Sequence, residues 1–188
     1  MKKIFFLAVF ASTLAFGQSK KVATSDVHWW GYKVAKTKSS SHDGTIKVKS
    51  GNMMMNGNEL VGGVFVLDMK SINATDLSGE DQADLNNHLK NGDFFEVEKF
   101  PTASFKITSV KKNNDKVYNK LVTGSLTVKG KTNNISFPAK VLYSNGVVSL
   151  ESNKFSFNRQ KFDVTYKSSM KDVFLNDDIE MLVKVSAK

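Results

Sequence analysis

Apolar and polar residues alternate along most of the chain, which predicts β-strands with one buried face. The clearest rows run through residues 103–108, 135–143 and 179–185. Other strand-like runs cover residues 27–35, 44–49, 60–69, 117–128, 147–157 and 162–166. The Asn-Gly pairs at 56–57 and 145–146 favour tight hairpins, because both residue types tolerate positive φ. Many strands joined by short turns predict an all-β antiparallel sandwich or barrel.

One segment, residues 78–92, interrupts the alternation and predicts a short helix. Ser78 is a predicted N-cap with an acidic residue three positions later, and Asn91-Gly92 is a predicted helix end. One face of this helix gathers three side chains, those of Leu85, His88 and Leu89. Because a helix of this length is marginal alone, we expect it to pack on the sheet and to flank an opening.

The N-terminus predicts export. Two lysines follow Met1, an apolar stretch covers residues 4–16, and Ala15 and Gly17 provide the small residues of a cleavage site. We therefore expect residues 1–17 to be a signal peptide and residues 18–188 to form one periplasmic or secreted domain. The apolar stretch is shorter than the roughly 20 residues that a membrane-spanning helix needs.

The formal net charge of +9 raises the question of an anionic partner. Of the 27 basic residues only Arg159 is an arginine, and the lysines are scattered between apolar residues. Nucleic-acid binding favours clustered arginine, so we expect no nucleic-acid partner. A solvated barrel exterior explains the lysines, and transient contact with an anionic membrane surface stays open. Cysteine is absent, which excludes disulfides and thiolate chemistry.

No catalytic motif emerges from the sequence. The three histidines, His28, His42 and His88, lack partners at metal-ligand spacing. Neither a nucleophile elbow nor a phosphate-binding glycine loop occurs. We therefore expect a protein that is not an enzyme, with no metal site and no cofactor. Two alternatives stay open, an integral outer-membrane barrel and a lipid-modifying enzyme that would depend on His88 or Arg159.

Arg159 is an unusual member of an apolar row. It follows Phe155 and Phe157 at a spacing of two, so it is predicted to lie on the interior side. A buried guanidinium needs partners. Either an ion pair with a strand-end acid such as Asp163 or Asp178, or a ligand headgroup at the mouth of the barrel, would provide them.

Several longer motifs resemble a known family. They are SHDGTI at 41–46, LVGGVFVLDMKSI at 60–72, HLKNGDFFEVEKFPTASF at 88–105, VTGSLTVKG at 122–130 and FNRQKF at 157–162. In this order they resemble the YceI-like family, also called polyisoprenoid-binding or lipocalin-like periplasmic proteins. Asn158 departs from the family, which often has Asp before the arginine.

The resemblance implies an extended eight-stranded antiparallel, lipocalin-like barrel with one short helix and a hydrophobic tunnel. Periodicity alone does not distinguish a filled core from such a tunnel. With the resemblance, we expect a carrier or sink whose partner is an apolar lipid, either a polyisoprenoid or a fatty-acid-like chain. Homodimerisation stays open. The residues expected to contact the ligand are Trp30, Phe65, Leu67, Phe94, Phe95, Phe105, Ile107, Leu126, Phe137, Val141, Phe155, Phe157, Arg159 and Met181.

Overall fold

The computed structural model describes residues 17–35, 40–168 and 172–188. The predicted signal peptide, except for Gly17, lies outside these ranges. Ten strands are present in the described residues: β1 (Gln18–Ala35), β2 (Ser40–Asn56), β3 (Glu59–Ala74), β4 (Thr102–Lys112), β5 (Lys120–Val128), β6 (Lys131–Ser144), β7 (Val147–Ser152), β8 (Phe155–Asn158), β9 (Val173–Leu175) and β10 (Asp178–Ala187). The helix α1 (Gly79–Lys90) and the 3-10 turn η1 (Arg159–Phe162) complete the described elements.

Eight of the strands close into an antiparallel barrel. Strands β1 to β7 pair in sequence order, β7 pairs with β10, and β10 returns to pair with β1. The short strands β8 and β9 are additions, on the edges of β10 and β1. The expected eight-stranded barrel with one helix is therefore confirmed, with two extra strands.

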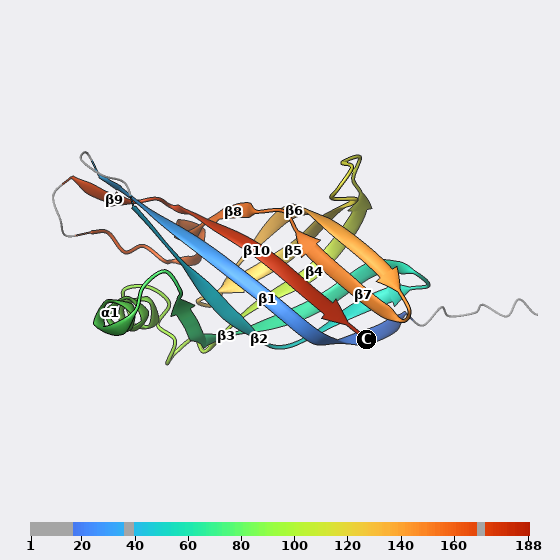
Figure 1. The fold of residues 1–188 in the computed structure, drawn as a ribbon, viewed down its shortest axis with the longest axis horizontal. Coiled ribbons are helices and arrows are strands. Elements are labelled where there is room, and N and C mark those ends of the chain that lie inside the picture. The colour runs from blue at the N-terminus through green and yellow to red at the C-terminus, as the bar shows by residue number, and fades with distance from the viewer. Residues whose placement is uncertain (1–16, 36–39, 169–171) are drawn as a thin grey trace, which may run out of the picture.

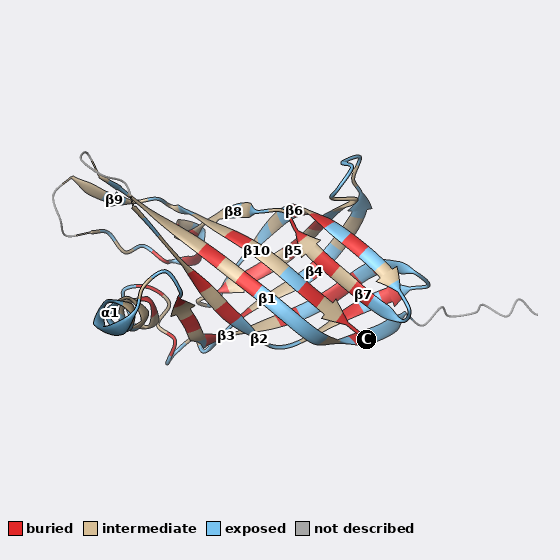
Figure 2. Cartoon of the chain, in the orientation of Figure 1, coloured by how far each residue is buried: buried red, intermediate tan, exposed pale blue. Residues whose placement is uncertain are grey.

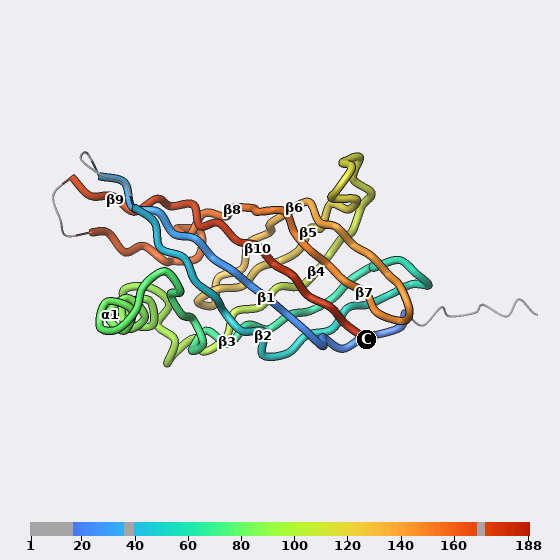
Figure 3. Tube along the Cα trace, viewed as in Figure 1, coloured from blue at the N-terminus to red at the C-terminus, as the bar shows by residue number. Residues whose placement is uncertain are grey.

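The barrel is long and narrow (Figures 1 and 3). Strand β1 has 18 residues, which at about 3.3 Å per residue corresponds to roughly 60 Å. Helix α1 and strand β9 lie at one end of the barrel, here called the α1 end. The β2–β3 and β6–β7 turns and the C-terminus lie at the other, here called the hairpin end. As the Asn-Gly pairs predicted, Gly57, Asn145 and Gly146 have positive φ.

Two predicted strands differ from the structure. The run at 147–157 is divided into β7 and β8, because residues 153–154 leave the sheet between them. Both pieces pair with the same strand, β10. The run at 162–166 is not a strand, since η1 ends at Phe162 and Asp163 turns the chain with a φ of 58°.

The interior is filled at the hairpin end. Buried side chains alternate with exposed ones along the strands there (Figure 2), as period two requires. This filled cluster includes Met53, Met55, Leu60, Val122, Ala139, Val141, Val148 and Ala187. A second cluster surrounds the interior toward the α1 end, and that half of the barrel is hollow.

Candidate ligand-binding site

The hollow half contains a cavity of about 270 Å³. Strands β1 to β5 and β8 to β10 contribute to its wall, together with α1, the segment after α1 and the segment after β8. Its lining is mostly apolar. Besides the predicted residues, it includes Trp29, Ile46, Met69, Ile72, Leu85, Leu89, Ala103, Val128, Phe162, Val164, Leu175 and Ile179.

A second cavity, of about 80 Å³, continues toward the filled end. The two share part of their lining, namely Leu67, Leu126, Phe157 and Met181. Phe65, Phe105, Ile107, Phe137 and Phe155 line the second cavity. The two spaces therefore lie in line along the barrel, and the second ends against the filled cluster.

All the predicted contact residues except Trp30 and Val141 line one of these cavities. Phe94, Phe95 and Arg159 line the larger one. Whether they contact a ligand stays a prediction. Val141 points inward as expected, but it belongs to the filled cluster at the hairpin end.

Trp30 does not line either cavity, and this expectation is corrected. It lies on the outer face of β1, where Lys154 Nζ is 4.0 Å from its ring centre. Lys154 also pairs with Glu180 at 2.6 Å. This hydrogen bond, with a further one from Tyr32, holds the pKa of Glu180 below its ordinary value, and Glu180 raises the pKa of Lys154.

The neighbouring Trp29 is the tryptophan that lines the cavity. Val27 and Trp29 are both buried and share one face of β1, so Trp30 must face outward. Gly44 leaves room for the Trp29 ring, because a Cβ there would be 2.6 Å from its Cζ2 atom and 1.9 Å from the Asn73 carbonyl oxygen. Among the residues that the structure describes, none accepts a hydrogen bond from the buried Trp29 Nε1 atom, a costly state for a donor.

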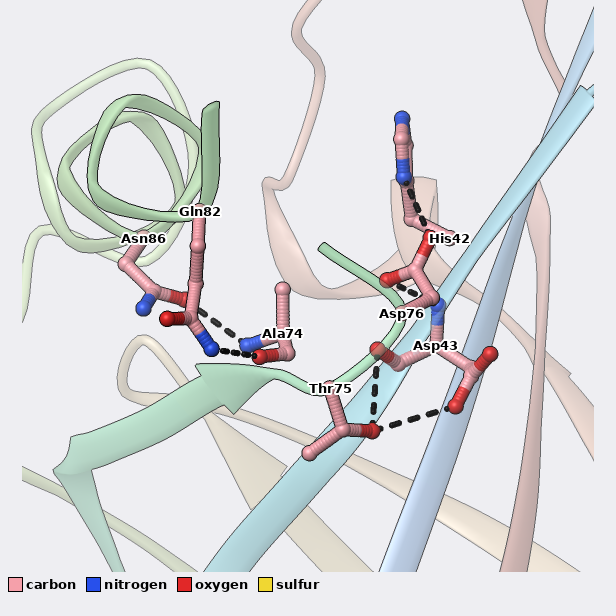
Figure 4. Close-up of polar contacts among 7 residues, drawn as sticks. All are labelled: His42, Asp43, Ala74, Thr75, Asp76, Gln82 and Asn86. Carbon is pink, nitrogen blue, oxygen red and sulfur yellow. Dashed lines mark hydrogen bonds and ion pairs between the residues drawn. The ribbon is translucent and has the colours of Figure 1, made fainter. Parts of the chain in front are cut away.

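Helix α1 is attached to the end of β3 by side chains that replace strand pairing (Figure 4). Asn86 accepts a hydrogen bond from the Ala74 N–H at 2.8 Å, and Gln82 donates one to the Ala74 carbonyl at 2.7 Å. These two helix residues are four apart, so they lie on one face. The attachment brings Leu85, His88 and Leu89 to the cavity wall, as their spacing predicted.

The polar groups of the cavity wall lie toward the α1 end. His42 Nδ1 is 2.8 Å from Asp76 Oδ2, and His88 Nδ1 is 3.4 Å from Asp93 Oδ2. The His88 ring also packs edge-on against Phe94 and Tyr166. Each carboxylate therefore orients the imidazole beside it.

Arg159 lies in the cavity wall but is bound by protein groups. Its guanidinium donates to the Val164 carbonyl at 2.6 Å, to the Asn176 carbonyl at 3.3 Å and to Asp177 Oδ1 at 2.9 Å. The expectation of an ion pair is therefore confirmed, but the partner is Asp177 rather than Asp163 or Asp178. Its role is to hold η1 against the segment that precedes β10.

The described residues contain no group of three or more His, Asp or Glu side chains arranged to hold a metal ion. Within the same residues, no helix is long and apolar enough to span a bilayer.

Sequence comparison identifies relatives over parts of the chain. A UPF0312 protein of Pseudomonas paraeruginosa is 43% identical over 60 residues, which cover 32% of this chain and 30% of the relative. A protein YceI of Salmonella arizonae is 29% identical over 125 residues, which cover 62% of this chain and 61% of the relative. The chain thus spans less than two thirds of the length of either relative.

Solved structures share the fold at low identity. Burkholderia cenocepacia BcnA superposes with a TM-score of 0.66 at 18% identity, covering 87% of this chain and 96% of BcnA. A polyisoprenoid-binding domain from Saccharophagus degradans, implicated in plant cell wall breakdown, has a TM-score of 0.60 at 12% identity and covers 90% and 97%. The family model described as the YceI-like domain matches residues 17–187, and the chain therefore belongs to the YceI-like family.

Proposed function

We propose that this protein is an exported carrier or sink that binds the long apolar chain of a lipid, a polyisoprenoid or a fatty-acid-like molecule, inside the hollow half of its barrel. The observation that carries the proposal is the pair of cavities in line along the barrel, lined mostly by aliphatic and aromatic side chains. The Saccharophagus relative of the same fold, which is described as polyisoprenoid-binding, supports it.

Binding rather than catalysis fits the chemistry of the cavity. Its histidines lie toward the α1 end, and the inner cavity is lined by apolar residues. Burial of one methylene group contributes about 0.8 kcal/mol, which corresponds to about a fourfold gain in affinity. A passive apolar site should therefore discriminate chains by length and width more than by headgroup.

Export is the second part of the proposal. The signal-peptide pattern of residues 1–17 supports it, as does the resemblance to periplasmic YceI-like proteins. N-terminal sequencing of the protein recovered after osmotic shock tests this part, and the expected first residue is Gln18. A form that keeps Met1 and sediments with membranes after alkaline extraction would contradict it.

The binding proposal can be tested on the purified protein. Mass spectrometry of an organic extract should detect a long apolar molecule in stoichiometric amount. In titrations with linear alcohols of increasing length, the Kd should fall about fourfold per added methylene until the tunnel is full. An affinity that does not depend on chain length would argue against the proposal.

A matched pair of variants on one strand assigns the binding to the cavity. Leu126 lines both cavities, whereas Leu121 lies on the outer face of the same strand, β5. Leu126→Trp should fill the junction of the cavities and weaken the binding of long chains at least tenfold. Leu121→Trp adds the same ring outside and should leave binding unchanged. Equal losses of affinity in the two variants would contradict the assignment of binding to the cavity.

A further inference from the structure

The wall of the barrel is not hydrogen-bonded to the same extent all the way round. The pairing of β6 with β7 ends at Ala139 and Ser152, followed by one backbone bond from the Asn153 N–H to the Pro138 carbonyl. Beyond this point β8 pairs only with β10. In the described residues, β6 residues 131–137 have no ladder partner on the side of β8. We call this boundary, between residues 131–137 and residues 155–163, the seam.

Proline explains where the ladder ends. In an antiparallel pair, a residue directs its N–H and its C=O toward the same neighbour. The Pro138 carbonyl accepts from Asn153, so the missing N–H of Pro138 would also have faced this edge. Proline is confined to such interrupted edges because it cannot donate.

Side chains close the seam instead of a ladder. On the inside, the rings of Phe137 and Phe155 stack across it, with centroids 4.3 Å apart and an interplanar angle of 14°. Nearer η1, Asn133 Nδ2 donates to the Lys161 carbonyl at 2.7 Å, and Lys131 pairs with Asp163 at 3.2 Å. Opening the seam would break these contacts but no strand ladder.

The two sides of the seam are anchored differently. Residues 155–158 are paired with β10, and Arg159 fixes η1 to Val164, Asn176 and Asp177. The β5–β6 hairpin is paired on its other side, within itself. The β8–η1 segment can therefore separate from β6 while both keep their backbone pairing.

The seam also lies over the interior that the ligand would occupy. Phe157 lines both cavities, while Phe137 and Phe155 line the inner one. A chain that entered only at the α1 end would have to thread lengthwise along the barrel. A chain that entered through the seam would reach both cavities sideways.

We infer that the seam is a lateral portal, through which the apolar chain of the ligand enters and leaves the barrel. This inference rests on the proposed function. The residues of the portal are Phe137 and Phe155 on its inner side and Asn133, Lys131 and Asp163 at its outer clamp. The ligand class is a flexible linear lipid chain, which can be laid into the barrel along its length.

Covalent closure of the seam tests this inference, and the absence of cysteine makes the chemistry selective. Lys131→Cys with Asp163→Cys, both exposed positions, is bridged by a short bis-maleimide. The matched control is Thr127→Cys with Thr132→Cys, whose side chains contact each other between the ladder-paired strands β5 and β6. A third pair, Asn73→Cys with Asn86→Cys, bridges α1 to β3 at the α1 end. The probe is cis-parinaric acid, with uptake and release followed by stopped-flow fluorescence.

The bridged seam variant should take up and release the probe at least tenfold more slowly than the unbridged variant, with an unchanged Kd. The bridged β5–β6 control should exchange at the parent rate. Exchange at the parent rate in the bridged seam variant would overturn the lateral portal and leave the proposed function standing. If only the variant bridged between α1 and β3 exchanged the probe more slowly, the lateral portal would be overturned in favour of an entrance at the α1 end. A parent protein that does not bind the probe would overturn the proposed function and the portal together.

Discussion

Replacement of Phe137 by alanine probes the interior where the second cavity meets the filled cluster. The Phe137 side chain is 3% exposed, and it packs against the rings of Phe105 and Phe155, with centroids 5.6 Å and 4.3 Å away. Truncation of a buried phenylalanine to alanine typically lowers the free energy of unfolding by about 3–5 kcal/mol. The ladder with β5 holds β6 in place on one side of Phe137, so the wall on that side cannot collapse into the space, and we expect a loss within that range.

A double-mutant cycle isolates the stacked pair. Phe137→Ala, Phe155→Ala and the double variant are compared by urea unfolding of lipid-free protein. Offset-stacked aromatic pairs contribute about 0.5–1.5 kcal/mol beyond burial, so the coupling free energy should lie in that range. A variant that is folded but destabilised should also release the probe faster, since the seam loses its inner contact.

Leu142→Ala is the matched control for this experiment. Leu142 lies on the same strand, β6, but is 50% exposed on the outer face, so its loss should change stability by no more than about 0.5 kcal/mol. A loss below about 1 kcal/mol for Phe137→Ala, or a coupling of zero with Phe155, would refute the packing argument for this level of the barrel.

Three further perturbations follow from single contacts. Arg159→Met should lower the free energy of unfolding by about 3 kcal/mol in urea titrations, because it leaves buried carbonyls unpaired. Lys154 lowers the pKa of Glu180, so this pair stabilises the fold above the unfolded-state pKa of about 4.3, and the stabilisation is lost as the pH falls through the lower pKa of the folded state. In Lys154→Met, the free energy of unfolding should therefore depend less on pH between pH 5 and 3. Gly44→Ala should lower the free energy of unfolding in urea titrations by about 3 kcal/mol, because its Cβ would overlap the Asn73 carbonyl oxygen. Gly92→Ala, with open space around it, should change the free energy of unfolding by no more than about 0.5 kcal/mol.

The alternation of residues was sufficient to predict an antiparallel sandwich or barrel and most of its inward-facing rows, and the family resemblance added the eight-stranded barrel. Phe65 and Leu67, for example, project inward from one strand at the predicted spacing. The prediction that Trp30 lines the cavity was wrong because tryptophans occupy two successive positions of β1. Whichever face of the strand points inward, an aromatic residue lies inside the barrel. The buried Val27 lies two positions before Trp29 and therefore on the same face of β1, whereas Asp26 and His28 share the face of Trp30, and this difference was the signal that identifies the inward-facing tryptophan.

The partner of Arg159 could not be predicted from local pattern. The strand that carries Phe155 and Phe157 ends at Asn158, and the chain then turns through η1. The guanidinium consequently reaches Asp177, which directly precedes β10 and lies 18 positions away along the chain. Such a contact depends on tertiary structure, and spacing in the sequence does not predict it.

The division of the interior into a filled half and a hollow half was also beyond the reach of periodicity, since both halves show the same alternation. Residue size separates them only partly. Methionines Met53 and Met55 fill the hairpin end, but Met69 and Met181 line the cavity at the other end. What decides is the width of the barrel and the covering by α1, which are properties of the closed sheet.

Lys20 shows how the filled half limits the ligand. The scattered lysines were interpreted as a solvated exterior, but Lys20 is buried at the hairpin end, where its Nζ donates to the Gly146 carbonyl at 2.6 Å and lies 5.5 Å from the centre of the Tyr143 ring. An apolar chain advancing from the cavities would have to displace both the filled cluster and this hydrogen-bonded cation, whose desolvation without a partner is costly. The interior is therefore closed at this end. Under the proposed function, the part of a ligand chain that exceeds the hollow half should lie at the α1 end or at the seam, where polar groups are present to receive a headgroup.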